Sequence, residues 1–309
     1  MTESLTVSVP TEKLAADVRE RLDPSLDIEV VLWADGAPPR ERIDIVVPPY
    51  MKQGAMLRAS ADVGPRLIQG QAIGYDGVAD VLPAGVPYAN ATSVHEAATA
   101  ELAVGLMIAA QRELPRVVRN QDRRTWDNFW TSGLADRRIV MLGYGGVAKG
   151  IAARLSGFEA ELVAVASRAR EEDGIRVHTI GDLADLLPTA EILVNVLPGG
   201  PETRRLIDDA ALSALPDGAL VVNVGRGSTF DTDALVDHVS RGRIRMASDV
   251  FDPEPLPEDH PLWTLPNTLI TPHVGGRTSA MAPRIAKLVA QQAARLARGE
   301  DPVNVVLGG

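Results

Sequence analysis

The stretch "VMLGYGGVAKG" (residues 140–150) has the glycine pattern of a phosphate-binding loop between a strand and a helix. Its apolar start predicts a strand, and the residues after the glycines predict a helix. Gly143 permits a tight turn, and Gly145 lets a pyrophosphate approach the backbone. Amides at the start of the helix would point at that pyrophosphate. The stretch therefore predicts a dinucleotide site formed by Gly143, Gly145, Gly146 and Val147.

The pattern around this loop predicts a parallel sheet. From Arg138 onward, apolar runs alternate with helical patterns, and the connections are short. Strands joined by helical crossovers are typical of a doubly wound α/β domain. Six strands are predicted in this region, at residues 139–142, 162–166, 192–196, 219–224, 245–249 and 268–271.

A second group of apolar runs lies in the first ninety residues. Their continuous apolar character favours a parallel sheet that is covered on both faces. The predicted strands are 5–9, 28–33, 43–47 and 66–70, with a helix at 11–22.

Both ends of the chain are expected to build one domain. A final helix is predicted at residues 283–298, with Gly299 as its cap, and we expect it to return to the first domain. The fold class is therefore α/β, with two doubly wound parallel-sheet domains. Residues 94–282 would form the dinucleotide-binding domain, and residues 1–93 with 283–309 the substrate-binding domain.

A helix of unusual composition is predicted near the first domain boundary. "SVHE" (93–96) has the Ser-x-x-Glu spacing of a capping box, and the "AATAELAVGLMIAAQREL" that follows is apolar on nearly every face. Such a helix is buried rather than laid on a surface. We expect it to lie between domains or between subunits.

The strand predicted after the glycine loop ends without the acidic residue that usually selects NAD. An Asp or Glu about twenty residues beyond the loop binds the ribose hydroxyls and repels a 2′-phosphate. Here the strand ends in Ser167 and Arg168, and Arg170 follows. A serine hydroxyl and arginine forks suit a phosphate. This favours NADP, with NAD as the second choice; the alternative is that both arginines are solvated and both cofactors are used.

Three further side chains are predicted at the same edge of the sheet as the glycine loop. Arg226 lies between two glycines after one strand, Glu254 follows the next, and His273 follows the last. Arg226 could bind the carboxylate of a 2-oxo acid. His273 could protonate the ketone as hydride arrives, and Glu254 would keep the imidazole charged.

Each of these three residues also has a structural alternative. Arg226 could pair with a surface acid, Glu254 could be solvated, and His273 could bond to the backbone. Because all three follow a dinucleotide loop at one predicted edge, the catalytic interpretation is favoured.

The remaining histidines are weaker candidates for a site. His95 is predicted in a helix cap, His178 and His238 in charged surface patterns, and His260 in a loop. No pattern of histidines and carboxylates has the spacing of a metal site, so we expect no metal.

Composition argues against several classes of function. The 309-residue chain has a formal net charge of −10, which argues against nucleic-acid binding. It has no cysteine, which excludes disulfides and thiolate chemistry. It shows neither an apolar stretch of spanning length nor a signal-peptide pattern, so we expect a cytoplasmic protein without a membrane partner.

At these motifs the chain resembles the D-isomer-specific 2-hydroxyacid dehydrogenase family. The resemblance runs from about Leu67 to Gly276 and is carried by "HEAATAELAVGLMIAAQR", "VMLGYGGVAKGIAARL", "ILVNVLPGGPETRRLI", "ALVVNVGRGSTFDTDALV", "SDVFDPEPLPEDHPLW" and "NTLITPHVGG". It implies a Rossmann cofactor domain inserted into a flavodoxin-like substrate domain. It also implies a homodimer, for which the helix after Ser93 and the arm bearing Trp126 and Trp130 are candidate contacts.

The resemblance further implies roles for single residues. It assigns Arg226 to substrate binding, Glu254 to the histidine partner and His273 to acid/base catalysis. Asp249 would bond the nicotinamide carboxamide.

In the substrate domain, the resemblance implies that the amides of Ile73 and Gly74 bind the substrate carboxylate. Specificity would lie with Tyr50, Met51 and Tyr75. The missing acidic selector is similar to that of NADP-preferring glyoxylate and hydroxypyruvate reductases, so these two acids are the first expected substrates.

Two other functions stay open on the sequence. A phosphite dehydrogenase of the same superfamily would use the same kind of triad, and a dinucleotide sensor or corepressor would use the fold without catalysis. The intact set of Arg226, Glu254 and His273 favours an oxidoreductase that acts on a small 2-oxo or 2-hydroxy acid of D configuration.

Overall fold

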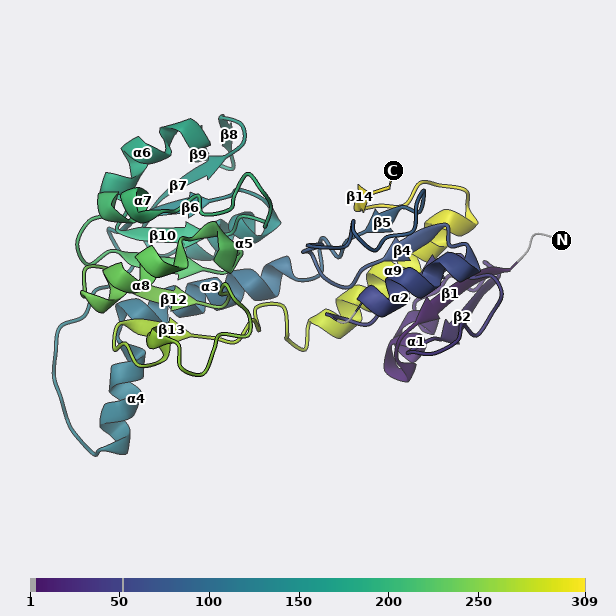
Figure 1. Ribbon diagram of the computed structural model, residues 1–309, viewed down its shortest axis with the longest axis horizontal. Helices are drawn as coiled ribbons and strands as arrows, with labels where there is room; N and C mark the ends of the chain where they lie inside the picture. Colours follow the sequence, from purple (N-terminus) through teal and green to yellow (C-terminus); the bar gives the residue numbers. More distant parts are fainter. Residues whose placement is uncertain (1–3, 52, 309) are drawn as a thin grey trace. The chain divides into compact units, whose positions relative to one another are not determined.

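The structure is a computed structural model that describes residues 4–51 and 53–308. It divides into two compact units (Figure 1). We call Met1–His95 with Arg277–Gly309 the terminal unit and Glu96–Gly276 the central unit. Each unit has its own sheet and its own hydrophobic cores. This architecture confirms the predicted α/β class.

The sheet of the terminal unit has the strand order of a flavodoxin-like domain. The order is β14-β5-β4-β3-β1-β2; β1 to β5 run parallel, and β14 pairs antiparallel with β5. The run β2-β1-β3-β4-β5 is the doubly wound flavodoxin arrangement. The strands are β1 (Leu5–Val9), β2 (Ile28–Leu32), β3 (Ile45–Val46), β4 (Leu67–Gln69), β5 (Tyr88–Ala89) and β14 (Val305–Leu307).

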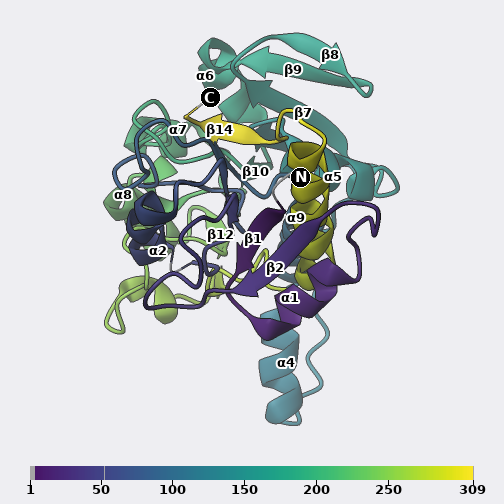
Figure 2. The same ribbon diagram turned by 90° about the vertical axis from the view of Figure 1, so that its right-hand side faces the viewer.

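Helices cover both faces of this sheet. Alternate side chains of its strands point to opposite faces, so they enter two different cores. Ile45 and Leu67 join the core that holds the buried faces of α1 and α9, whereas Val46 and Ile68 join the core that holds α2. Figure 2 looks onto this unit and shows α1 beside α9. Gly299, with φ of 72°, follows the last helix as predicted. The helices are α1 (Glu12–Arg19), α2 (Gly54–Ala59), the 3₁₀ turn η1 (Ser60–Val63) and α9 (Met281–Ala297).

The sheet of the central unit has the Rossmann order. Its strands run β13-β12-β11-β10-β6-β7-β9-β8, so the order reverses between β6 and β10. Ligands of such sheets bind at that reversal, beyond the carboxyl ends of the strands. The strands are β6 (Arg138–Leu142), β7 (Glu161–Ala166), β8 (Arg170–Glu172), β9 (Ile175–Thr179), β10 (Ile192–Asn195), β11 (Leu220–Asn223), β12 (Arg245–Ser248) and β13 (Thr268–Ile270).

Two of these strands were not predicted from the sequence. β9 runs parallel to β7, and β8 pairs antiparallel with β9 across Asp173 and Gly174. Both turn residues have positive φ, 54° and 75°, as a two-residue hairpin turn requires. The hairpin was missed because β8 is charged and largely exposed, so it presents no apolar run.

The helices of the central unit include the long apolar helix that the sequence predicts. α3 packs against α5 and against β11 and β12. It begins at Glu96, three residues after Ser93, which has φ of 81°. The helices are α3 (Glu96–Gln111), α4 (Leu114–Asp122), α5 (Gly146–Leu155), α6 (Leu183–Leu186), α7 (Asp209–Ala214) and α8 (Thr232–Ser240), with 3₁₀ turns η2 (Ile180–Asp182), η3 (Leu187–Thr189), η4 (Gly227–Thr229) and η5 (Pro261–Trp263).

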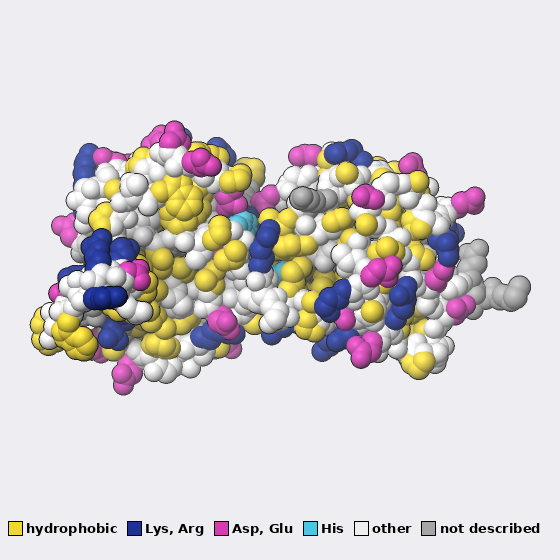
Figure 3. All heavy atoms as spheres, turned by 90° about the horizontal axis from the view of Figure 1, so that it is seen from below, with side chains coloured by type: hydrophobic (Ala, Val, Ile, Leu, Met, Phe, Trp, Pro, Cys, Tyr) yellow, Lys and Arg dark blue, Asp and Glu magenta, His cyan; other side chains and the backbone are white. Residues whose placement is uncertain are grey.

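An arm projects from the central unit after α3. Helix α4 has no buried residue, and the chain after it contains Trp126 and Trp130, which are 97% and 98% exposed. Figure 3 looks onto the side toward which α4 projects and shows basic and hydrophobic side chains together over this end of the central unit. Among the described residues, no helix is long and apolar enough to cross a membrane.

Candidate active site

The carboxyl ends of the parallel strands bring the predicted side chains of the central unit to one edge. The glycine loop follows β6, Arg226 follows β11, Asp249 follows β12 and His273 follows β13. In a parallel sheet these ends all face the same way. The edge includes the reversal between β6 and β10, where a doubly wound sheet binds its ligand.

The glycine loop has the shape that a dinucleotide needs. Gly143 has φ of 98°, and a Cβ there would approach Val196 to 3.1 Å. Gly145 is the opposite case: a Cβ there would meet nothing within 4 Å, so open space lies beside its backbone. Helix α5 begins at Gly146 without a side-chain cap, which leaves its first amides to bind an anion. These features fit the pyrophosphate of a dinucleotide.

The predicted cofactor selectors lie at the end of β7 and on the unpredicted hairpin. Ser167 and Arg168 are exposed just after β7. Arg170 is the first residue of β8, where its Nε donates to Glu172 at 2.8 Å and its Nη2 to the Tyr144 carbonyl at 3.2 Å. The arginine therefore contacts the glycine loop directly.

Buried asparagines and two crowded glycines fix the loop that carries Arg226. Asn195 and Asn223 stand opposite each other at the ends of β10 and β11, joined by a 2.9 Å hydrogen bond. Asn223 donates to the Arg226 carbonyl at 3.1 Å. A Cβ on Gly225 would lie 2.6 Å from the Leu197 oxygen, and one on Gly227 would lie 1.9 Å from the Phe251 carbonyl carbon.

This asparagine pair was not predicted from the sequence. A signal was available, because "ILVN" and "LVVN" are two buried strands that each end in asparagine. A buried amide in a strand needs a partner, and two asparagines at matching strand ends provide it for each other.

Glu254 and His273 form the closest charged pair among the predicted site residues. Glu254 Oε2 lies 2.7 Å from His273 Nδ1, and Glu254 Oε1 accepts from the Phe251 amide at 2.7 Å. Within the described part of the chain, His273 Nε2 has no hydrogen-bond partner, so it is the ring nitrogen available to a substrate.

Both partners titrate away from their ordinary values. The hydrogen bond to Glu254 raises the pKa of His273, against the effects of burial and of the Arg226 charge. Burial alone would raise the pKa of Glu254, but the hydrogen bonds from His273 and Phe251, with the Arg226 charge, lower it overall. Arg226 is therefore close enough to act on both groups.

The direction of these shifts gives the pH range of the pair. The contribution of His273 to stability is lost as pH rises through its raised pKa. That of Glu254 is lost as pH falls through its lowered pKa. Between those two pKa values the imidazolium and the carboxylate coexist, so the imidazole carries a proton that it can donate.

Asp249 holds the turn that presents His273. Its buried carboxylate accepts from the Thr271 hydroxyl at 2.6 Å and from the amides of Val274 and Gly275 at 2.9 and 2.8 Å. His273 has φ of 51°, which is uncommon outside glycine, and its amide donates to the Asp249 carbonyl at 2.8 Å. These contacts give Asp249 a structural task besides any contact with a cofactor.

In the terminal unit, hydrogen bonds shape the loop that contains Ile73 and Gly74. Asn90 Nδ2 donates to the Ile73 carbonyl at 2.9 Å, and Gln71 Nε2 to the Pro48 carbonyl at 2.7 Å. Among the described residues, the amides of Ile73 and Gly74 donate no hydrogen bond, so they are available to a ligand.

The three predicted specificity residues of this unit differ in exposure. Tyr50 is half-buried and stacks on the buried ring of His95 with centroids 5.7 Å apart. Met51 and Tyr75 are 50% and 40% exposed. The guanidinium of Arg277 lies 5.8 Å from the Tyr50 ring centroid, a cation–π distance.

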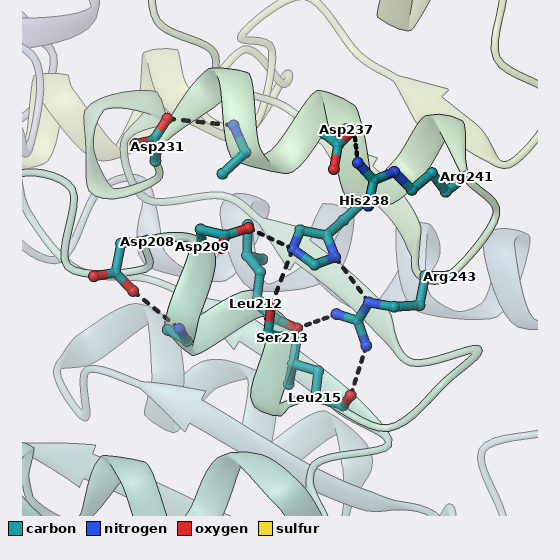
Figure 4. A network of polar contacts seen from close by, with 12 residues as sticks. Asp208, Asp209, Leu212, Ser213, Leu215, Asp231, Asp237, His238, Arg241 and Arg243 are labelled. Carbon is teal, nitrogen blue, oxygen red and sulfur yellow. Dashed lines mark hydrogen bonds and ion pairs between the residues drawn. The ribbon is translucent and has the colours of Figure 1, made fainter.

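One histidine lies where the sequence pattern did not suggest. His238 is 5% exposed rather than on the surface, so that expectation is wrong. Its Nε2 lies 3.0 Å from Asp209 Oδ1 and 3.5 Å from Ser213 Oγ, and its Nδ1 accepts from Arg243 at 2.8 Å (Figure 4). Aspartate and serine face the same ring nitrogen, which is not the geometry of a nucleophilic triad. The network instead joins α7 to the end of α8.

The described residues contain no group of three or more His, Asp or Glu side chains that could hold a metal ion.

The sequence profile described as "D-isomer specific 2-hydroxyacid dehydrogenase, NAD binding domain" matches residues 104–275. This segment is more than half of the chain. The chain therefore belongs to the D-isomer specific 2-hydroxyacid dehydrogenase family.

Proteins that are similar to this chain are named for different substrates. A D-3-phosphoglycerate dehydrogenase of Mycobacterium tuberculosis (strain ATCC 25618 / H37Rv) is 32% identical over 324 residues, which cover 98% of this chain and 59% of that protein. A glyoxylate reductase of Pyrococcus horikoshii is 30% identical over 254 residues, covering 78% of this chain and 76% of that protein. The chain spans about half the length of the phosphoglycerate dehydrogenases that it matches.

A solved structure extends the similarity to the whole chain. A D-isomer specific 2-hydroxyacid dehydrogenase from Xanthobacter autotrophicus Py2, in complex with NADPH and MES, is 25% identical to this chain. The alignment covers 99% of both chains with a TM-score of 0.83.

Proposed function

We propose that this protein is an NAD(P)-dependent oxidoreductase that interconverts a small 2-oxo acid and the corresponding D-2-hydroxy acid. The observation that carries the proposal is the 2.7 Å pair of His273 and Glu254, with the Arg226 charge acting on both. The pair and the open glycine loop both lie beyond the carboxyl ends of the parallel strands. A general acid, an anion-binding arginine and a dinucleotide loop are the parts that this reaction requires.

The chain's own residues would hold the cofactor at its phosphates. Gly145 leaves room beside the backbone, and the first amides of α5, at Gly146 and Val147, would donate to the pyrophosphate. Asp249 would bond the carboxamide with the acceptor capacity that the 271–275 turn leaves. When bound, the nicotinamide ring supplies or accepts the hydride.

The substrate would be held by its carboxylate and protonated at its ketone. Arg226 offers a planar fork to the carboxylate oxygens. His273 Nε2 would donate its proton to the ketone oxygen, and in the oxidative direction the neutral ring would take the proton back. Glu254 holds Nδ1, and this hydrogen bond raises the pKa of the imidazole and so favours its protonated form.

The proposal for the terminal unit concerns substrate recognition. The amides of Ile73 and Gly74 would donate to the substrate carboxylate, because neither has a partner among the described residues. Tyr50, Met51 and Tyr75 would contact the rest of the substrate and set its permitted size.

We propose NADPH as the preferred cofactor and glyoxylate or hydroxypyruvate as the first substrates. Ser167, Arg168 and Arg170 replace the acidic selector of an NAD enzyme. The similar Xanthobacter structure holds NADPH, and the similar Pyrococcus protein is named a glyoxylate reductase.

The test is an absorbance assay at the nicotinamide band with a panel of 2-oxo acids, each with NADPH and with NADH. We expect turnover of glyoxylate or hydroxypyruvate, with a higher kcat/KM for NADPH. Better efficiency with NADH would overturn the cofactor preference. Oxidation of phosphite without turnover of any 2-oxo acid would replace the reaction, and nucleotide binding without any turnover would support a sensor.

The arginine assignment has its own test. Arg226→Ala should lose nearly all turnover of 2-oxo acids, while cofactor binding measured by fluorescence stays intact. Arg176→Ala is the matched control, because Arg176 is exposed on β9 and its side chain makes no hydrogen bond among the described residues. Wild-type efficiency in Arg226→Ala would remove this residue from the site.

We also propose that the protein is a homodimer that joins through the arm of the central unit. The apolar side chains of Leu114, Val117 and Val118 on α4 are exposed, as are Trp126 and Trp130. Exposed apolar patches of this kind mark interaction sites. Light scattering should give twice the chain mass, and replacing Trp126 and Trp130 by Ala should give monomers, whereas Trp263→Ala should not.

A further inference from the structure

A cluster of charged side chains lies beside the glycine loop. Glu172 on β8 accepts from Lys149 Nζ at 2.5 Å through one carboxylate oxygen and from Arg170 Nε at 2.8 Å through the other. Both cations are therefore bound by the same carboxylate. All three side chains are partly exposed, so solvent and ligands can reach them.

The local sequence explains why these groups meet. Arg170 and Glu172 are two residues apart on β8, so their side chains share one face of the strand, and Glu171 points to the other face. Lys149 lies in the first turns of α5, the helix that begins at the glycine loop. The hairpin thus places a carboxylate between its own arginine and the lysine of the nucleotide-binding helix.

Arg170 also binds the loop itself. Its Nη2 donates to the Tyr144 carbonyl at 3.2 Å, its Nη1 donates to the Arg168 carbonyl at 3.2 Å, and its guanidinium lies 5.7 Å from the Tyr144 ring centroid. The guanidinium, which was predicted to bind a phosphate, is therefore already shared among one carboxylate and two carbonyls. Three of its five N–H donors therefore already have acceptors, so a ribose 2′-phosphate must share the guanidinium with them.

We propose that Glu172 is a specificity-determining residue that weakens the preference for NADP by occupying Lys149 and Arg170. The inference rests on the proposed function, because it concerns the same nucleotide site. The carboxylate acts in two ways: it competes with a 2′-phosphate for both cations, and its own charge repels the phosphate. A ribose 2′-hydroxyl does not carry that penalty.

The titration of the cluster agrees with this arrangement. The hydrogen bond to Glu172 raises the pKa of Lys149. Hydrogen bonds from Lys149 and then Arg170 lower the pKa of Glu172. The carboxylate and both cations are thus charged together at neutral pH.

The experiment measures nucleotide binding without catalysis. Isothermal titration calorimetry with adenosine 2′,5′-bisphosphate and with AMP gives the affinity ratio for a 2′-phosphate over a 2′-hydroxyl. Because the groups are exposed and screened, we expect Glu172→Gln to raise this ratio by about three- to tenfold over the wild type. Glu171→Gln, on the same strand but facing away, should leave the ratio unchanged.

A second variant separates release of the cations from loss of charge. In Glu172→Gln, the released Lys149 can bind the 2′-phosphate. Adding Lys149→Gln should therefore reverse part of the rise in the affinity ratio. An unchanged or lower ratio in Glu172→Gln would overturn the inference, as would an equal rise in Glu171→Gln.

The outcomes distinguish this inference from the proposed function. A wild type that favours AMP would overturn the NADP preference, while a rise in Glu172→Gln would still support the role of Glu172. If neither nucleotide binds the wild type, both proposals fail. The kcat/KM ratio for NADPH over NADH should rise in parallel with the binding ratio.

Discussion

The two outermost strands of the central sheet, β13 and β8, carry charged groups that are held in place in different ways. After β13, at one edge, His273 sits in a turn that three hydrogen bonds to the buried Asp249 hold in place. At the other edge, Arg170 and Glu172 sit on a two-residue hairpin, and exposed ion pairs hold them. The proposed proton donor is thus positioned by hydrogen bonds to a buried carboxylate, whereas the proposed cofactor selector can exchange partners.

The largest effect should come from the β13 edge. We expect His273→Ala to lower kcat by about 10²- to 10⁴-fold, the usual contribution of a positioned general acid. Cofactor binding should survive, because the glycine loop does not depend on this side chain. His178→Ala, on β9, is the control and should keep its activity. A loss of less than threefold in His273→Ala would break the comparison.

The next effect tests the backbone packing near that edge. Gly227→Ala would bring a Cβ to 1.9 Å from the Phe251 carbonyl carbon, so the backbone must move. We expect the free energy of unfolding in urea to fall by about 3 kcal/mol, at the upper end of overpacking costs. Gly157→Ala, where a Cβ would meet nothing within 4 Å, should change it by less than about 0.5 kcal/mol. Equal stability of the two variants would contradict the observed contact.

A third prediction concerns pH. Glu254 raises the pKa of His273, so Glu254→Gln should lower it. In the reductive direction the protonated ring is required, so kcat/KM falls as pH rises through that pKa. The falling limb should therefore move to lower pH in the variant. If the falling limb lies at the same pH in the wild type and in Glu254→Gln, Glu254 does not set the pKa of His273.

The smallest effect should come from the hairpin. Arg170→Gln should raise the KM for NADPH by only about two- to fivefold, because the arginine is exposed and already shared with Glu172. The KM for NADH should stay the same. Arg176→Gln, on the neighbouring strand, is the matched control. A much larger effect would show that Arg170 is not restrained by its present partners.

These two ends of the strand order also differ in what the sequence could predict. The glycine loop and the residues after β11, β12 and β13 all follow apolar strands, so hydrophobic periodicity predicted that they meet at the carboxyl ends of the strands. The β8–β9 hairpin carries charges in place of an apolar run, and only Asp173-Gly174 signalled its turn. The partners of Arg170 could not be predicted, since they depend on that hairpin.

The sequence pattern also did not predict which polar residues are buried. His238 lies in a charged segment, yet Asp209 and Arg243 satisfy both of its ring nitrogens inside the protein. For His238, tertiary contacts decide an environment that local spacing leaves open.

The absence of a Cβ at Gly227 has a consequence for how this site can change. The backbone beside Arg226 lies directly against the backbone at Phe251, three residues before Glu254. This main-chain contact therefore contributes to the spacing between the Arg226 guanidinium and the Glu254 carboxylate. The scaffold is preorganised, so replacing either side chain should remove chemistry while leaving the frame ready to accept another.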